Sequence, residues 1–397
     1  MIVLSGGDVV LPARLAGPST LVIDNGRIVD IVSGPREAGR EEIRVDVSGH
    51  IVAPGFVDVH VHGVEGYDTL SQPDAIEQMA LRLPRYGVTA FCPTTVACAP
   101  RELRDALAAV GRARAAPPRG ARVLPAHLES NFINPAYAGA QPINCLRLPR
   151  AKGPAAGGFT GAEILDEIAR ARPDVGIVTL APELEGALDL IASLTKHGHR
   201  VSIGHTGATY DEARAGIEAG ARQATHLFNR MTPLTHRSPG VVGAVLETDA
   251  VAAEIISDGV HVHPAAMRAA IAAKGPARIM AITDGTAGSG LPPGSRATLG
   301  GRPITVTDTA RLDDGTLAGS VLTMDRAFAR LVTLGGLSPV EAAAMTATTP
   351  ARELGLHGHG VIATGAVADL VVMDSTFNVV QTWVGGELAW SRNRIDE

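Results

Sequence analysis

The chain has 397 residues, of which 45% are hydrophobic and 19% are charged, and its formal net charge is −6 at pH 7. This composition is typical of a globular protein with a large core and excludes a disordered chain. The acidic balance argues against nucleic acid as a partner, because proteins that bind it present a basic face to the phosphates. The negative net charge does not exclude a local basic pocket that binds a small anion.

The N-terminal segment shows no basic region followed by an apolar run, and the chain has no uninterrupted apolar stretch of about 18 residues. We therefore expect no secretion signal, no contact with a membrane and a cytoplasmic location. The three cysteines, Cys92, Cys98 and Cys145, cannot all pair with one another. Reduced thiols are the expectation for that location.

Both ends of the chain are predicted to form strands. The run 21–32, LVIDNGRIVDIV, contains two alternating apolar stretches joined by Asn25-Gly26, a strong signal for a β-hairpin. The run 365–390 has the same character, with turn residues at 374–375 and 385–386. These patterns predict one small β-sandwich domain formed by residues 1–51 and 363–397.

The middle of the chain, residues 52–362, alternates strand-like and helix-like stretches. Ala-, Leu- and Glu/Arg-rich segments with helical spacing separate many of eight apolar runs, at 56–61, 89–95, 121–128, 176–182, 200–205, 223–227, 252–259 and 277–283. This rhythm predicts a parallel sheet covered on both faces, here a TIM-like (β/α)8 barrel. A doubly wound open sheet is the alternative, but no GxGxxG motif follows the first strand.

His60 and His62 form the most informative pair in the sequence. They lie two residues apart in PGFVDVHVHG, on a run that alternates as a strand does, so both side chains point to one face. Two imidazoles at the end of a strand can bind one divalent metal ion. Since barrel enzymes build their sites at the C-terminal ends of the strands, polar residues at the other strand ends are candidate ligands.

Such residues follow several predicted strands: Glu129, His205, His226, Asp258 with His261 just beyond it, and Asp284. Taken singly, a strand-end carboxylate usually caps the next helix, and a strand-end histidine is usually a hydrogen-bonded core residue. Four histidines and two carboxylates at the ends of separate strands together predict a metal centre. A hydrolytic centre also needs a carboxylate that moves a proton from water to a leaving amine, and Asp284 is the candidate.

The order HxH, Glu, His, His, Asp resembles the amidohydrolase superfamily and, within it, the family of N-acetylglucosamine-6-phosphate deacetylases. The most specific stretches that carry the resemblance are THLFNRMTPLTHRSPG at 225–240 and LAGSVLTMDRA at 317–327. The resemblance implies one or two divalent ions per subunit, zinc first, with iron, manganese or cobalt as alternatives. It places one ion on Glu129, His205 and His226, and a second on His60 and His62, shared through Glu129 and Asp284.

Lysine is scarce, and this bears on other amidohydrolases. Hydantoinases and dihydroorotases bridge two metals with a carbamylated lysine on a barrel strand. The three lysines of this chain, Lys152, Lys196 and Lys274, lie outside the predicted strands. Their positions count against those activities and agree with the bridging role that the resemblance gives Glu129.

The resemblance implies removal of the acetyl group from N-acetylglucosamine 6-phosphate, giving glucosamine 6-phosphate and acetate, by a homodimer. Arg237 is then expected to reach the phosphate in the neighbouring subunit's site, with Asn229 also at the phosphate and His261 at the sugar. The remaining candidates for substrate contact are Gln141, Arg230, Leu317, Ala318 and Gly319, of which the last three are expected at the acetyl group.

The chain departs from the family pattern near the expected substrate. Ser130-Asn131 stands where Gly-Pro is common, Gln141 where histidine is frequent, Arg230 where a small residue is usual, and TDG at 283–285 replaces TDA. The preferred sugar can therefore differ, and a deacetylase of another N-acyl amino sugar phosphate, such as N-acetylgalactosamine 6-phosphate, is the first alternative. A non-catalytic barrel that serves as a binding protein is the second, and the presence of all six ligands disfavours it.

Overall fold

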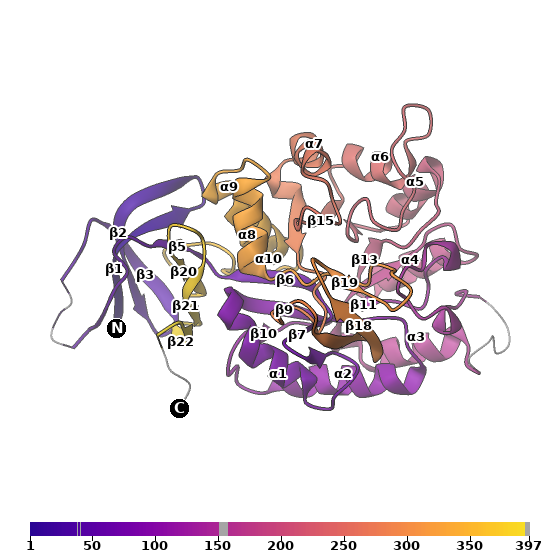
Figure 1. Ribbon diagram of the computed structural model, residues 1–397, viewed down its shortest axis with the longest axis horizontal. Helices are drawn as coiled ribbons and strands as arrows, with labels where there is room; N and C mark the ends of the chain where they lie inside the picture. The colour runs from indigo at the N-terminus through magenta and orange to yellow at the C-terminus, as the bar shows by residue number, and fades with distance from the viewer. Residues whose placement is uncertain (38, 40, 151–157, 394–397) are drawn as a thin grey trace.

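The computed structural model describes residues 1–37, 39, 41–150 and 158–393, and it contains two bodies, a barrel and a separate sheet (Figure 1). The barrel consists of parallel strands β6 (Phe56–Val61), β9 (Val88–Thr95), β10 (Arg122–Val123) with β11 (Ala126–Glu129), β12 (Val175–Leu180), β13 (Arg200–Ile203), β14 (Gln223–Ala224), β15 (Ala252–Ile256) and β16 (Ile279–Ile282). All eight predicted runs contain one of these strand positions, so the (β/α)8 barrel is confirmed.

The ring closes where the last strand meets the first. The amide of Asp284 donates to the carbonyl of His60 at 2.9 Å, and the amide of His62 donates to the carbonyl of Gly285 at 2.7 Å. Strands β6 and β9 are buried at every residue, as expected for a parallel sheet with helices outside and side chains filling the inside. The closure therefore brings three predicted site residues to one seam of the barrel.

Helices pack around the barrel: α1 (Ala75–Arg82), α2 (Pro100–Ala115), α3 (Gly161–Arg170), α4 (Ala187–Lys196), α5 (Tyr210–Glu218), α6 (Gly240–Glu247), α7 (Pro264–Lys274), α8 (Met324–Thr333), α9 (Pro339–Ala343) and α10 (Thr349–Glu353). Short 3-10 segments occur at Leu83–Tyr86, Pro135–Tyr137, Ile143–Cys145, Arg172–Asp174 and Pro276–Arg278, and a π-helical turn at Ala344–Thr348. Helices α3, α5 and α9 begin with capping boxes, in which a Ser or Thr and a Glu three residues on satisfy free backbone amides. Among the described residues, no helix has both the length and the apolar character required to cross a bilayer.

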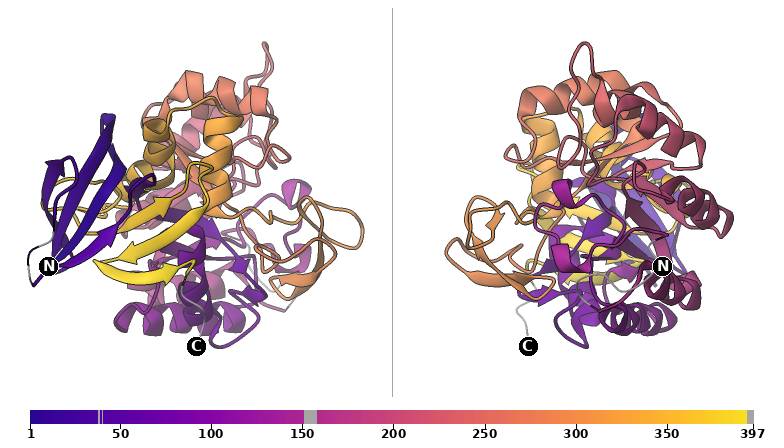
Figure 2. Two further views of the ribbon diagram at one scale, coloured as in Figure 1. Left: turned by 60° about the vertical axis from the view of Figure 1, so that its left-hand side comes forward. Right: turned by 90° about the vertical axis from the view of Figure 1, so that its right-hand side faces the viewer.

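The two ends of the chain share one mixed sheet, which lies beside the barrel (Figures 1 and 2). Its order is β22 (Glu387–Ser391), β21 (Val379–Val384), β20 (Leu370–Met373), β5 (Ile51–Pro54), β1 (Ile2–Leu11), β2 (Arg14–Asp24) and β3 (Arg27–Ser33), with β4 (Ile43–Asp46) also paired to β1. Asn25 and Gly26 join β2 to β3 with φ of 47° and 75°, as a tight hairpin of this type requires. The separate β domain from both ends is confirmed, and its boundaries at 51/52 and 362/363 stay a prediction.

A small antiparallel sheet, which the sequence pattern did not reveal, projects beside the barrel (Figure 2). It comprises β17 (Arg296–Leu299), β18 (Arg302–Val306) and β19 (Ala310–Arg311), and the short pair β7 (Gly63–Val64) and β8 (Tyr67–Asp68) is likewise unpredicted. Leu299 of β17 packs in a minor core with Ala318. The small sheet therefore holds the 317–319 segment next to the strand ends of the barrel.

Candidate metal centre

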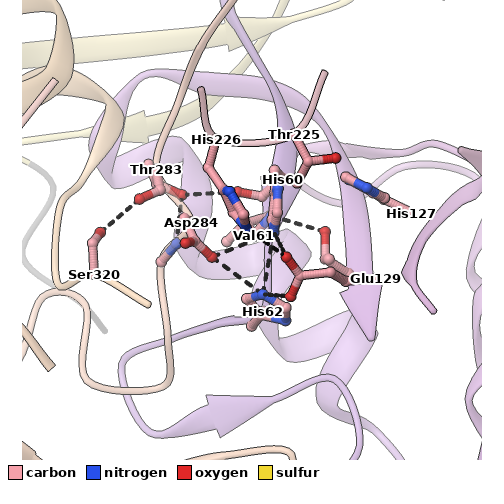
Figure 3. Close-up of polar contacts among 12 residues, drawn as sticks. His60, Val61, His62, His127, Glu129, Thr225, His226, Thr283, Asp284 and Ser320 are labelled. Atoms are coloured by element: carbon pink, nitrogen blue, oxygen red, sulfur yellow. Dashed lines mark hydrogen bonds and ion pairs between the residues drawn. The ribbon is translucent and has the colours of Figure 1, made fainter. Parts of the chain in front are cut away.

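The six ligands named from the sequence converge at the C-terminal end of the barrel. Figure 3 shows His60, His62, Glu129, His226 and Asp284 of this group. The Nε2 atoms of His60 and His62 lie 3.2 Å apart, and Oδ1 of Asp284 lies 3.3 Å from the first and 3.2 Å from the second. All six side chains are buried: His60, His62, Glu129, His205, His226 and Asp284. The structure thus gathers in one place residues that are far apart in the sequence.

Glu129 lies between two groups of ligands. Its Oε1 is 2.8 Å from Nε2 of both His205 and His226, and its Oε2 is 3.6 Å from Nε2 of His62. Gln141 donates from its amide to Oε2 of the same carboxylate. One carboxylate therefore faces both groups, as a ligand shared by two ions would.

The backbone positions three of the ligands through an uncommon conformation. His205, His226 and Asp284 have φ of 48°, 31° and 48°, in the left-handed region that non-glycine residues rarely adopt. Each such residue costs about 1 to 3 kcal/mol, which the surrounding fold must supply. Backbone strain of this kind is concentrated at functional sites, and here it falls on the predicted ligands.

The hydrogen bonds at Nδ1 make these side chains suitable for a divalent cation. His205 donates from Nδ1 to the carbonyl of Tyr137 at 2.8 Å, and His60 has Oε2 of Glu254 2.9 Å from its Nδ1. With the hydrogen on Nδ1, each Nε2 presents a lone pair to the centre. For His205 this lone pair faces Oε1 of Glu129 at 2.8 Å, an arrangement of two acceptors that a cation between them stabilises.

The buried carboxylates favour positive charge at the centre, which a proton supplies in the metal-free protein and a metal ion can replace. Burial alone would lower the pKa of His60, but the carboxylates of Asp284 and Glu254 raise it to about 10. Burial alone would raise the pKa of Asp284, but His60 and His62 lower it to about 2. Ionised carboxylates in a buried site attract cations, and protons compete with metal ions for the same imidazoles.

Two functional neighbours were missed by the sequence analysis, Glu254 on β15 and His127 on β11. His127 donates from Nδ1 to the carbonyl of Val59 at 3.0 Å and has the hydroxyl of Thr179 2.7 Å from Nε2. Burial lowers the pKa of His127 to about 4, so its ring is neutral. The available signal was a polar residue within an apolar strand run, Glu254 in AAEII at 252–256 and His127 in ARVLPAHL at 121–128, whereas the prediction rested on polar residues at strand ends.

A cavity opens onto the ligands and takes in most of the predicted substrate residues. Its lining includes His62, Glu129, Gly139, Ala140, Gln141, His205, His226, Asn229, Arg230, His261, Asp284, Leu299, Leu317 and Gly319. Ala318 is fully buried in the minor core and Arg237 is exposed on a loop, so neither lines this cavity. The side chain of Ala318 packs under the small sheet between Leu317 and Gly319, and its expected contact with an acetyl group stays a prediction.

Two polar anchors shape the cavity. The carboxylate of Asp258 accepts from Nδ1 of His261 at 2.6 Å and from its backbone amide at 2.8 Å, which fixes the ring at the cavity. Asn131 donates from its amide to the carbonyls of Cys98 and Cys145 at 2.8 and 2.7 Å. The hydrogen bonds of the Asn131 side chain thus hold the turn after Glu129 in place. A Gly-Pro pair, which is common at these two positions in the family, would restrict the backbone without such bonds.

Comparison with known proteins gives a consistent assignment. The Amidohydrolase family matches residues 51–389. N-acetylgalactosamine-6-phosphate deacetylase of Escherichia coli O157:H7 is 37% identical, covering 89% of this chain and 92% of its own, and N-acetylglucosamine-6-phosphate deacetylase of Bacillus subtilis (strain 168) is 34% identical, covering 94% and 93%. The structure of a mutant N-acetyl-D-glucosamine-6-phosphate deacetylase from Mycobacterium smegmatis, in complex with N-acetyl-D-glucosamine-6-phosphate, matches with a TM-score of 0.87 at 32% identity, covering 98% of this chain and 99% of that chain.

Proposed function

The chain belongs to the amidohydrolase family, whose members are hydrolases, and from this premise we propose that it removes the acetyl group from N-acetylglucosamine 6-phosphate. The products are glucosamine 6-phosphate and acetate. The observation that carries the proposal is the buried group of four imidazoles and two carboxylates, all of which line the cavity except His60. Relatives with this activity that align over nearly the whole chain support the choice of substrate.

We propose that the centre holds two divalent ions, zinc first. Glu129, His205 and His226 would hold one, and His60 and His62 would hold the other together with Asp284, while Glu129 faces both groups. Such a cation, when bound, supplies Lewis acidity that acidifies water and polarises an amide carbonyl. Cobalt, manganese and iron suit similar ligands.

Asp284 is the proton carrier in this proposal. Its pKa of about 2 keeps it ionised at neutral pH, so it can accept a proton from the water that attacks the acetyl carbon. The same carboxyl then delivers that proton to the sugar nitrogen as the carbon–nitrogen bond breaks. The water oxygen leaves in acetic acid, whose remaining proton passes to the amine, so the products at neutral pH are acetate and the protonated amine.

The remaining residues orient the substrate. His261, fixed by Asp258, contacts the sugar, and Asn229 and Arg230 lie at the phosphate end of the cavity. Leu317 and Gly319 border the acetyl group. The exposed Arg237 reaches the phosphate of the neighbouring site in a homodimer, and the enzyme acts in the cytoplasm.

The galactosamine epimer is the second candidate substrate. A relative that is 37% identical is an N-acetylgalactosamine-6-phosphate deacetylase, and the turn after Glu129 differs from the family pattern at Ser130 and Asn131. A barrel without catalysis is disfavoured because the structure brings all six ligands together.

An acetate-release assay on both epimers, with and without a chelator, tests the proposal. We expect chelator-sensitive release, restored by added zinc or cobalt, and a higher kcat/KM for the glucosamine epimer. A reversed ratio of kcat/KM would assign the galactosamine epimer. Release that a chelator leaves unchanged, after dialysis against it, would contradict a metal-dependent reaction.

A further inference from the structure

A line of buried polar side chains runs through the barrel to the metal centre. Nε of Arg200 donates to Oε1 of Gln223 at 2.6 Å, and the amide of Gln223 donates to Oε1 of Glu254. The other oxygen of Glu254 lies 2.9 Å from Nδ1 of His60. Gln223, Glu254 and His60 are fully buried. Barrel interiors are mostly filled by branched apolar side chains, so a line of buried polar side chains indicates a specific role.

Each hydrogen bond along the line has a fixed direction. A guanidinium has only donors, so Arg200 must face the carbonyl oxygen of Gln223, and the amide nitrogen of Gln223 must face Glu254. Arg200 is itself held by Oε2 and the carbonyl of Glu353, at 2.6 and 3.0 Å. Glu254 therefore accepts on both oxygens, and the hydrogen that it accepts from His60 is the one on Nδ1.

The same carboxylate touches the other half of the centre. Oε2 of Glu254 also accepts from the backbone amide of His226 at 3.2 Å, in the residue whose φ is 31°. His127 lies 3.9 Å from Oε1, but its Nδ1 donates to Val59. Glu254, His60 and His127 are thus committed to hydrogen bonds with defined donors, although they could form a metal-binding group by distance alone.

We propose that Glu254 is a positioning residue that fixes His60 with its hydrogen on Nδ1 and its Nε2 lone pair toward the metal. Arg200 and Gln223 support this role, because their fixed hydrogen-bond directions keep Glu254 a hydrogen-bond acceptor. The inference rests on the proposed two-ion centre. Loss of a carboxylate that orients a metal-binding imidazole typically costs about 10- to 100-fold in metal affinity. The loss should fall mainly on the His60/His62 half, because Glu254 contacts the ring of His60 and reaches the other half only through the backbone amide of His226.

The first test measures metal binding rather than turnover. Metal-free protein is titrated with Co²⁺ alone, and bound metal is determined after equilibrium dialysis. We expect two sites in the wild type, and in Glu254→Gln an affinity about 10- to 100-fold weaker at one site with a smaller change at the other. The new amide must turn its nitrogen toward either Gln223 or Nδ1 of His60, and both are donors. Unchanged affinity at both sites would overturn the inference.

The second test exchanges the two partners. In Gln223→Glu/Glu254→Gln, the carboxylate at position 223 accepts from Arg200 and from the new amide, whose oxygen is then free to accept from His60. We expect the double variant to bind Co²⁺ within about tenfold of the wild type at both sites, a comparison that holds even if the single variant does not fold. A double variant that loses the same site would show that orientation is not the cause.

Two controls separate this inference from the proposed function. Asp58 is a fully buried carboxylate that accepts from the backbone amides of His60 and Thr283, at 3.2 and 3.3 Å, so Asp58→Asn should keep both cobalt affinities. If Asp58→Asn lowers the cobalt affinity as much as Glu254→Gln does, the specific role of Glu254 is overturned. His60→Ala should lose the site that Glu254→Gln weakens. If His60→Ala leaves cobalt binding unchanged, the two-ion centre fails; if only Glu254→Gln leaves it unchanged, the inference fails alone.

Discussion

The two halves of the metal centre are built in different ways. His60 is part of β6 and His62 follows it directly, and a contact with Glu254 orients the ring of His60. His205 and His226 instead lie at strand ends in left-handed backbone, and a carbonyl at Tyr137 orients the first of them. One half depends on the regular two-residue period of a strand, and the other depends on strained turns. Glu129 joins them, so the comparison can be tested by removing ligands from either side.

Removal of the shared carboxylate should have the largest effect. Glu129→Gln withdraws a charge that faces both halves, so we expect both cobalt affinities to fall and acetate release to drop by a factor on the order of 10³ or more. Metal analysis and the acetate assay measure this. The matched control is Glu183→Gln, a carboxylate that holds Thr206 and Gly207 beside the site without touching a ligand ring. A Glu129→Gln protein that keeps both ions would contradict the bridging geometry.

Asp284→Asn should separate chemistry from metal binding. The amide cannot accept and return a proton, so turnover should fall by roughly 10² to 10⁴. The ion at Glu129, His205 and His226 should be retained, because Asp284 lies with the other half. The check is kcat together with metal content on the same preparation, and near-normal kcat would refute the role.

Single-ligand variants should distinguish the two halves directly. His62→Ala and His205→Ala should each lose one ion, with affinity at the affected site reduced by roughly 100-fold, as expected for loss of one of three or four ligands. The double variant should bind none. Cobalt titration of the three proteins measures this, and unchanged stoichiometry in His62→Ala would reject a second site.

Acid unfolding of the metal-free protein should show the ionisation of Asp284. Its pKa falls from the ordinary 3.8 to about 2 in the folded state, because His60 and His62 outweigh burial. Between these values the unfolded chain binds more protons, so the stability contributed by Asp284 is present above about pH 4 and is lost as the pH falls toward 2. Urea unfolding at several pH values should show that the difference in free energy of unfolding between the wild type and Asp284→Asn shrinks as the pH falls through that window. A constant difference would contradict the shift.

Arg230→Gly should have the smallest effect, and of the opposite sign. Arg230 is exposed with φ of 50°, so glycine removes backbone strain and should stabilise the protein by about 0.5 to 1 kcal/mol, measured by urea unfolding. The proposed phosphate contact predicts that KM rises in the same variant. Arg237→Gly is the control, since Arg237 is exposed without a positive φ and should gain no stability.

The contrast between regular strands and irregular turns also explains which features could be predicted from the sequence. The eight barrel strands were predictable because buried parallel strands are apolar on both faces, and the hairpin at Asn25-Gly26 because those residues favour positive φ. The His60/His62 pair was predictable because two residues on a strand share a face. These features depend on short-range patterns.

The remainder depends on contacts between distant segments. Strands β17 to β19 are short and partly polar, so no period marks them. Glu254 reaches His60 across the barrel, and no spacing within the sequence links the two. His205 and His226 adopt a left-handed backbone that histidine rarely favours, so no local pattern predicts it. The small sheet that packs on Ala318 has no signal in the sequence either.

The shared terminal sheet has a consequence for synthesis of the protein. Strand β5 pairs with β20, so the N-terminal strands lack one partner until nearly the whole chain has left the ribosome. A strand edge that waits unpaired invites association with other nascent chains. Pairing of β20 with β5 would then be a late step of folding that removes this free edge. A chain truncated before Leu370 should therefore aggregate rather than give a free barrel.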